Sequence, residues 1–285
     1  MDKLSLKAPA KINLYLRVLG KRPDGYHEID SLMQTIDLYD HLTIEKANRI
    51  ELICDHPSIP SGSSNLAHKA AVLMKRYTGI PGARILLKKK IPVGSGLGGG
   101  SSDAAFVIRG LSRLYDLDIS SGLKNEIARE IGSDVPFFLS GGRAVVGGRG
   151  ERVIPVRAPM DYSVVVIVPP VTSSTANVYG KLKIVLTMQN KPSLLQRGIE
   201  SSSFYQLMKS FRNDLEEVVL LDIPELKNLK EILIESGCVY SSVTGSGSAV
   251  FGISRLSGPG DYNLGDHLSR DHRVFYCRPV LLPSL

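Results

Sequence analysis

The sequence predicts an α+β fold, in which strands and helices do not alternate regularly along the chain. Five apolar, alternating segments separated by turn residues occupy the first 60 positions, which is typical of a sheet. The patterns that follow lack the strict alternation of a βαβ fold. A chain of 285 residues with 43% hydrophobic composition can bury one large or two medium cores. Because Pro169-Pro170 interrupts the chain after a buried strand pattern, we expect one domain at 1–168 and a second at 169–285.

The elements expected in the first domain start with strands at 4–8, 12–19, 29–38, 42–46 and 50–54. They continue with a helix at 65–77, a strand at 83–91, a helix that ends near 115, a helix at 123–131 and a short apolar segment at 135–139. Asn65 is a good N-cap for the first helix, and either Ser101 or Ser102 can cap the second.

The second half of the chain mixes both kinds of element. A buried strand pattern at 162–168 precedes helices at 176–182, 203–211 and 226–236, and then strands at 239–243, 249–254 and 273–278. The polar, irregular stretch 187–203 is predicted to be an insert.

Composition excludes several classes of protein. The longest strongly apolar run, 164–168, is far shorter than the roughly 20 residues of a membrane helix. The first residues lack the apolar core of a signal peptide, so we expect a cytoplasmic protein with no membrane partner. Three distant cysteines without C-x-x-C spacing indicate neither a disulfide framework nor a zinc site. The histidines have no metal-ligand spacing either, so we predict no metal-binding side chains.

The most informative segment is a glycine-rich stretch, residues 92–100, which we call the glycine loop. It contains five glycines within seven positions and stands directly ahead of two serines and an apolar helical pattern. Glycines allow backbone N–H groups to approach a ligand closely, and the start of the following helix favours an anion. The loop therefore predicts a phosphate-binding site.

Two known phosphate motifs fit this loop poorly. Gly94-x-Gly96-x-x-Gly99 formally matches the dinucleotide fingerprint, but no second strand follows the helix, as that fold requires. The Walker pattern fails because Ser101 and Ser102 stand where a lysine and a hydroxyl residue are needed. A simple tight connection rarely needs five glycines.

The net charge of +7 favours anionic partners, which include nucleic acids, acidic membrane surfaces and phosphorylated metabolites. The densest basic run, Lys88-Lys89-Lys90, precedes the glycine loop. It can raise the potential at a polyphosphate, or it can be a solvated strand edge. No basic stretch is interleaved with aromatic residues and no zinc-finger or RRM signature is present, so nucleic acid is not an expected partner.

Three separated segments resemble the motifs of the GHMP small-molecule kinases. They are Ala8-Pro-Ala-Lys-Ile-Asn-Leu, the stretch 92–105 that contains the glycine loop, and Val243-Thr-Gly-Ser-Gly-Ser-Ala-Val-Phe-Gly. The resemblance implies a ribosomal-protein-S5-like N-terminal domain, a ferredoxin-like C-terminal domain and an active site in the cleft between them. It also implies an ATP-dependent kinase for a small-molecule alcohol, with Mg²⁺ carried by the ATP.

Three further stretches, 22–28, 132–138 and 213–216, are similar to the branch of the family whose acceptor alcohol carries a cytidine diphosphate. Another GHMP kinase, for homoserine, mevalonate or a sugar, is the nearest alternative. A nicotinamide-dependent oxidoreductase and a basic nucleic-acid module with an S5-like fold are alternatives from other classes.

The resemblance assigns roles to particular residues of this chain. Lys11 and Asp134 correspond to the catalytic pair, with Asp134 as the general base. The acceptor-binding positions are Asn13, Tyr26, His27 and Tyr179, of which the two tyrosines enclose the cytosine base. The ATP-binding positions are Pro92, Val93, Gly94, Ser95, Gly96, Leu97, Gly98, Gly99, Gly100, Ser101 and Ser102, together with Asn65 and Lys89.

Several of these residues also have a purely structural interpretation. Taken alone, Asp134 is a turn or N-cap residue, Asn65 a helix cap and Lys89 an exposed lysine. Tyr26 taken alone is a loop-packing residue and Tyr179 a core residue of a helix. A lysine in an apolar strand, such as Lys11, either extends to solvent or faces a carboxylate, because an unpaired buried charge is costly.

Overall fold

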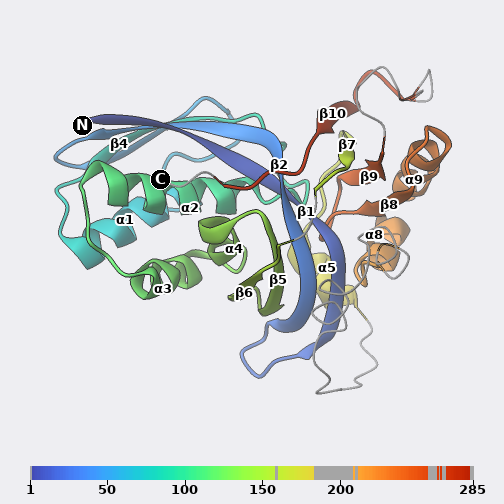
Figure 1. Cartoon of the computed structure of the whole chain (residues 1–285), viewed down its shortest axis with the longest axis horizontal. Coiled ribbons are helices and arrows are strands. Elements are labelled where there is room, and N and C mark those ends of the chain that lie inside the picture. The colour runs from blue at the N-terminus through green and yellow to red at the C-terminus, as the bar shows by residue number, and fades with distance from the viewer. Residues whose placement is uncertain are drawn as a thin grey trace.

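The computed structural model describes residues 2–157, 160–182, 208, 211–255, 262, 264 and 268–282. Two sheets organise this part of the chain (Figure 1). The first sheet has the order β3-β4-β2-β5-β6, and β1 pairs with β2. Its strands are β1 (Lys3–Lys21), β2 (His27–Lys46), β3 (Ile50–Cys54), β4 (Ala83–Lys88), β5 (Arg143–Gly148) and β6 (Arg152–Pro155).

The second sheet has the order β10-β7-β9-β8, with all neighbours antiparallel. Its strands are β7 (Ser163–Val168), β8 (Tyr240–Val243), β9 (Val250–Ser254) and β10 (Arg273–Cys277). The strands predicted at 162–168, 239–243, 249–254 and 273–278 are confirmed. The mixed order of strands and helices confirms the predicted α+β class.

The first sheet is covered by α1 (Leu66–Thr78), α2 (Gly99–Leu114), α3 (Ser121–Ile131) and α4 (Val135–Ser140). Figure 1 shows these helices together on one side of the long β1–β2 hairpin. They bury an apolar core against the sheet, in which Phe106, Phe137 and Ile44 are completely or almost completely enclosed. The other side of the hairpin faces α5 (Thr175–Lys181), α8 (Glu216–Asp222), α9 (Glu225–Glu235) and the second sheet.

The β1–β2 hairpin corrects the prediction of four separate strands at 4–8, 12–19, 29–38 and 42–46. Each predicted pair is one continuous strand. A bulge between Pro9 and Ala10 accommodates the proline without ending β1. Asp40 does not end β2, because its buried carboxylate finds hydrogen-bond donors beyond the strand.

One of the two predicted helix caps is confirmed, and the other is wrong. Asn65 caps α1 as predicted, since its side-chain oxygen accepts a hydrogen bond from the N–H of Ala67. The expected cap at Ser101 or Ser102 is wrong. Helix α2 starts at Gly99, and Gly98 precedes it in the left-handed conformation with φ 74°.

Three elements were not expected. Strands β5 and β6 form a hairpin around a glycine-rich turn. Because glycine is depleted in strands, the sequence did not indicate the short strand on either side of this turn. The short helix α8 begins at Glu216, three residues after Asn213. The expected helix at 203–211 and the expected insert at 187–203 lie outside the described residues, apart from Met208 and Phe211.

The second sheet begins before the expected domain boundary at residues 168 and 169. Strand β7 pairs with β9 and β10, so it belongs with the C-terminal elements. We therefore propose a boundary between β6 and β7. The segment after β10 returns to the first sheet, where Pro279 bridges to Ile36 of β2.

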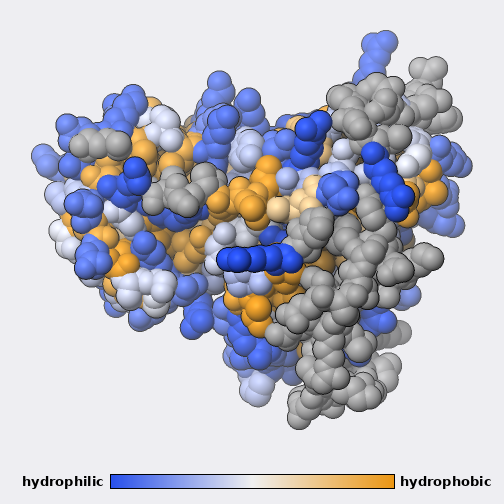
Figure 2. All heavy atoms as spheres, in the orientation of Figure 1, coloured by the Kyte–Doolittle hydropathy of each residue, from blue (hydrophilic) through white to orange (hydrophobic). Residues whose placement is uncertain are grey.

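On the face shown in Figure 2, polar and charged residues surround smaller groups of apolar ones. None of the helices in the described ranges combines the length and the apolar character needed to cross a membrane.

Candidate active site

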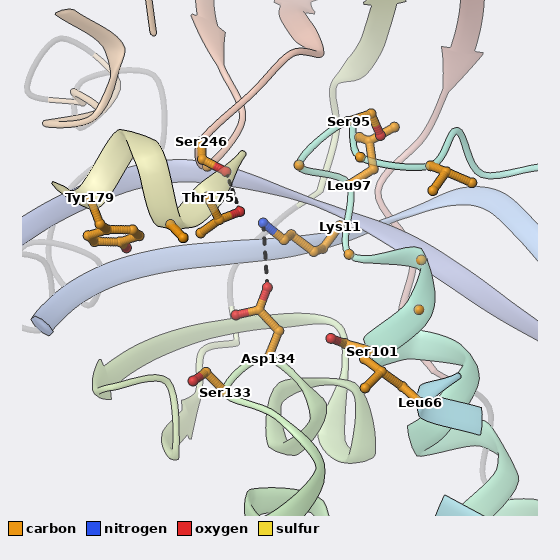
Figure 3. A pocket seen from close by; sticks show the side chains of 18 of the residues that line it. Lys11, Leu66, Ser95, Leu97, Ser101, Ser133, Asp134, Thr175, Tyr179 and Ser246 are labelled. Carbon is orange, nitrogen blue, oxygen red and sulfur yellow. Dashed lines mark hydrogen bonds and ion pairs between the residues drawn. The ribbon is translucent and has the colours of Figure 1, made fainter. Parts of the chain in front are cut away.

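A cavity of about 1250 Å³ is lined by residues of both domains. The first domain contributes β1, the glycine loop and the turn before α4, and the second contributes α5 and the β8–β9 connection. Figure 3 shows Lys11 and Asp134 in the middle, with Tyr179 to one side and Ser95 and Ser101 to the other. The cavity is therefore long enough to present two different ends to ligands.

The glycine loop forms one end of this cavity. Gly94, Gly96 and Gly98 have positive φ angles of 67°, 80° and 74°. A Cβ atom at Gly96 would lie 2.2 Å from the carbonyl oxygen of Thr244, so the loop backbone runs against the β8–β9 connection. Only glycine fits this conformation and this spacing. Such a backbone leaves N–H groups accessible to phosphate oxygens.

Helix α2 adds a positive end at the same place. The N–H of Ser102 donates to the carbonyl of Gly98 at 2.9 Å, which leaves the N–H groups of Gly99, Gly100 and Ser101 without helical acceptors. Ser101 lines the cavity, whereas Ser102 is completely buried and its hydroxyl has no hydrogen-bond partner. Of the two serines expected at the phosphates, only Ser101 faces the cavity. The helix start suits an anionic ligand.

Lys11 lies at the centre of the cavity. The side chain is about 5% exposed, and its Nζ lies 3.8 Å from Oδ2 of Asp134. Nζ also donates a hydrogen bond to the side-chain oxygen of Asn13. Burial lowers the pKa of the Lys11 ammonium, and the attraction of Asp134 partly opposes this effect. Lys11 was expected either to extend to solvent or to face a carboxylate. In the structure its side chain is buried and faces the carboxylate of Asp134.

Asn13 lies two residues after Lys11 on the same strand, and its side chain is enclosed. Its amide nitrogen donates to Oγ of Ser31 at 3.0 Å, and its backbone N–H donates to Oγ1 of Thr244 at 3.1 Å. Asn13 thus joins β1, β2 and the β8–β9 connection at one point. This network fixes the amide oxygen that accepts from Lys11.

Asp134 stands at the N-cap position of α4 but makes no capping hydrogen bond. Its side chain points instead toward Lys11 (Figure 3). Asp134 therefore occupies the expected turn and N-cap position, but its side chain does not cap the helix. About one third of the side chain remains exposed, which leaves the carboxylate accessible to a ligand hydroxyl.

Aromatic residues form the other end of the cavity. The rings of His27 and Tyr179 are stacked, with centroids 4.8 Å apart and an interplanar angle of 27°. The ring of Tyr26 is half exposed, and the guanidinium of Arg149 lies 4.8 Å above it. Burial lowers the pKa of His27 and raises that of Tyr179. Flat apolar surfaces with a neutral imidazole suit a heterocyclic base.

Asn65 and Lys89 also line the cavity, and both make internal contacts. The side-chain nitrogen of Asn65 donates to the carbonyl of Pro60 at 2.9 Å, in addition to the capping bond. The interpretation of Lys89 as an exposed lysine is wrong, because the side chain is only 4% exposed and contacts Asp40 and Asp103.

Sequence reasoning missed several polar residues of the cavity. The hydroxyls of Thr175 and Ser246 lie 2.8 Å apart beside Lys11 (Figure 3). Arg149 belongs to a glycine-rich turn without a recognisable motif. Ser246 stands within the third family motif, and its place in that motif was the one feature of the sequence that could have indicated it as a site residue. Within the described residues, no group of three or more His, Cys, Asp and Glu side chains has the arrangement of a metal site.

Comparisons with known proteins identify the family of this chain. The family described as GHMP kinases N terminal domain matches residues 65–142, and the GHMP kinases C terminal family matches residues 192–260. The 4-diphosphocytidyl-2-C-methyl-D-erythritol kinase of Brevibacillus brevis is 41% identical over 88% of this chain and 87% of its own. The enzyme of the same name from Clostridium botulinum strain Hall is 43% identical over 87% of this chain and 89% of its own.

Solved structures agree with the sequence comparisons. A crystal structure of 4-(cytidine 5'-diphospho)-2C-methyl-D-erythritol kinase is 34% identical and has a TM-score of 0.78, covering 97% of this chain and 99% of the other. Homoserine kinase from Cytophaga hutchinsonii shares the fold, with a TM-score of 0.75 at 19% identity over 99% and 95% of the two chains. The expected resemblance is confirmed, and the chain belongs to the GHMP kinases, in the family of the 4-diphosphocytidyl-2-C-methyl-D-erythritol kinases.

Proposed function

We propose that this chain transfers the γ-phosphoryl group of ATP to the 2-hydroxyl of 4-diphosphocytidyl-2-C-methyl-D-erythritol, in the non-mevalonate isoprenoid pathway. One observation carries the proposal: the Lys11–Asp134 pair lies between the glycine loop and the His27–Tyr179 stack. A kinase with a base-containing acceptor needs this order of phosphate site, reactive centre and aromatic site. The names of the relatives support the choice of acceptor.

We infer that the ATP phosphates bind along the glycine loop and at the start of α2. The left-handed glycines and the free N–H groups of the helix start support this placement. Asn65 borders the same part of the cavity and can contact the nucleoside. The ammonium of Lys89 is already engaged by two carboxylates, so its contribution to ATP binding is indirect.

We infer that the cytosine base of the acceptor binds at the aromatic end. Tyr26 and Tyr179 would enclose the base, and His27 would meet its polar edge. For this to happen, the His27–Tyr179 stack must open or shift to admit the base. Asn13 would face the methylerythritol part, although its amide nitrogen already donates to Ser31.

The reaction requires one proton transfer and one displacement. Asp134 accepts the proton of the acceptor hydroxyl, whose oxygen attacks the γ-phosphorus while the bond to the β–γ bridging oxygen breaks and ADP leaves. Lys11 orients Asp134 and stabilises negative charge on the transferred group. Asn13 holds the Lys11 ammonium in place for both tasks.

Mg²⁺ is expected as the ion carried by ATP, where it would neutralise charge on the phosphates. The carboxylates that line the cavity are Asp103 and Asp134, and Asp103 is paired with Lys89. Because the cavity offers so few carboxylates, it suits an ion that takes most of its ligands from phosphate and water. We also propose, as the sequence led us to expect, small-molecule partners, a cytoplasmic location and no nucleic-acid ligand.

A coupled assay of ADP release over a panel of alcohols tests the proposed function. We expect turnover with 4-diphosphocytidyl-2-C-methyl-D-erythritol and none above background with homoserine, mevalonate or galactose. Turnover with one of the other alcohols alone would assign the chain to a different GHMP kinase activity. Product analysis by ³¹P NMR would verify that the new phosphate is on the 2-hydroxyl.

A further inference from the structure

A buried cluster of three charged side chains lies beneath the glycine loop, next to the reacting groups but separate from them. The ammonium of Lys89 contacts Oδ2 of Asp40, and it lies 2.7 Å from Oδ2 of Asp103. The exposed fractions of the three side chains are 4%, 0% and 2%. We call these three residues the charge cluster.

The charge cluster joins the two ends of the glycine loop. At the entry to the loop, Oδ1 of Asp40 accepts hydrogen bonds from the N–H groups of Lys90 at 2.6 Å and Ile91 at 2.9 Å. At the exit, Asp103 belongs to α2, the helix whose first two residues, Gly99 and Gly100, are the last two of the loop. Lys89 thus bridges a strand residue that holds the entry and a helix residue at the exit.

The cluster also contacts the loop backbone closely. A Cβ atom at Gly99 would lie 3.1 Å from Nζ of Lys89 and 3.0 Å from Cγ2 of Ile91. The ammonium is therefore packed beneath the first residue of α2, whose N–H group is one of those without a helical acceptor. A shift of Lys89 would move this N–H group relative to the rest of the loop.

The cluster is buried and incompletely hydrogen-bonded, which argues against a mainly stabilising role. One ammonium faces two carboxylates, and Oδ1 of Asp103 has no hydrogen-bond partner. Burial raises the pKa of Asp103 to about 7, with a further contribution from Asp40 and opposition from Lys89. Buried ion pairs contribute little net stability in general, since desolvation offsets the attraction. The cluster is better explained by the position in which it holds the two ends of the glycine loop than by a contribution to stability.

We propose that Asp40 and Asp103 are positioning residues for ATP, which act through Lys89 to fix the spacing between the two ends of the glycine loop. The proposal rests on the proposed binding of ATP at this loop. It assigns Lys89 the role of a bridge within the protein rather than that of a phosphate ligand. A loop held by misplaced ends would present its N–H groups at the wrong spacing, and small displacements of this kind reduce binding and turnover strongly.

Three variants test this role: Asp103→Leu, Lys89→Met and the double variant. The shape-conserving Asp103→Asn is included in case Asp103→Leu does not fold. The matched control is Leu111→Ala, which removes core packing from α2 far from the loop and lowers the melting temperature without touching the cluster. For each variant we would measure the melting temperature, the KM values for ATP and for the acceptor, and the Kd of a non-hydrolysable ATP analogue by calorimetry.

We expect Asp103→Leu and Lys89→Met each to raise the KM and Kd for the adenine nucleotide by about tenfold or more, with the acceptor KM within about twofold of wild type. The double variant should resemble Lys89→Met, because either single change already breaks the bridge. Leu111→Ala should leave nucleotide affinity unchanged.

Two results would overturn the proposal. One is a normal nucleotide Kd in both single variants, with a loss of melting temperature like that of Leu111→Ala. The other is a multiplicative effect of the two changes on Kd, which would mean that the residues act separately. Because calorimetry does not depend on turnover, a wrong acceptor would leave this test intact. Failure of wild-type protein to bind the ATP analogue would instead refute the proposed function.

Discussion

The Nζ of Lys11 lies 3.8 Å from Oδ2 of Asp134, although the two residues come from different elements and are far apart in the chain. Lys11 is held from one side by Asn13, and Asp134 is free of the capping role that its position at α4 would allow. The arrangement leaves the carboxylate accessible from the cavity while its charge is balanced by a buried cation. Such a carboxylate can accept a proton from a bound alcohol.

The first prediction concerns the base itself. Asp134→Asn keeps the shape of the side chain but removes its ability to accept a proton. We expect kcat to fall by roughly 10² to 10⁴, as is usual for the loss of a general base, with the KM for ATP nearly unchanged. Steady-state kinetics measure both. A variant with near-normal kcat would remove Asp134 from the role of base.

The second prediction concerns the glycine loop, and the chain offers a matched pair of variants. Gly96→Ala places a methyl group 2.2 Å from the carbonyl oxygen of Thr244 at a φ of 80°, so the loop must move. Gly122→Ala, in α3 and outside the cavity, places its methyl group 3.5 Å from Oγ of Ser120, which is ordinary contact. We expect the Kd for ATP to rise strongly in the first variant and little in the second. Equal effects would show that loop shape does not control ATP binding.

The third prediction concerns the aromatic end. Tyr26→Ala and Tyr179→Ala should each weaken the cytidine-containing acceptor by about one to two decades in Kd, because stacking of a base is worth roughly 1 to 3 kcal/mol. ATP affinity should hardly change. Tyr276→Ala, at an exposed tyrosine of β10 outside the cavity, is the control. Equal weakening of both nucleotides would indicate that Tyr26 and Tyr179 support the fold instead.

The fourth prediction is a pH dependence. Burial lowers the pKa of Lys11 below its ordinary 10.5, and only the charged form can stabilise the phosphoryl group. The profile of kcat/KM reports the free enzyme, so its alkaline limb should descend below pH 10.5. In Lys11→Arg the limb should disappear, since a guanidinium stays charged. If the alkaline decline of kcat/KM persists in Lys11→Arg, it reports the titration of a group other than Lys11.

Local signals predicted the local features of this protein. Asn65 was recognised as a cap because capping involves residues two or three positions apart. The glycine loop was recognised because its glycines are contiguous, and the motif around Lys11 and Asn13 because both lie on one strand. The structure brings all of the predicted site residues into or beside one cavity, with Ser102 beneath its wall.

Features that depend on distant residues were not predictable from the chain alone. The burial of Lys89 requires Asp40 and Asp103, which are 49 and 14 positions away. The continuity of β2 through Asp40 likewise depends on hydrogen bonds from the distant N–H groups of Lys90 and Ile91. Strand β7 was grouped with the first domain because prolines follow it, but its hydrogen bonds to β9 and β10 place it in the second sheet. Sequence periodicity identifies strands without specifying their partners.

The central claim is that Lys11 and Asp134 act as one unit, and a double-mutant cycle on kcat tests it most directly. The four enzymes are the wild type, Lys11→Met, Asp134→Asn and the double variant, assayed with saturating ATP and acceptor. If Lys11 acts largely by holding Asp134 in place, the double variant should lose little more than the poorer single variant. Losses that multiply would contradict the account, because they would mean that the two side chains contribute independently.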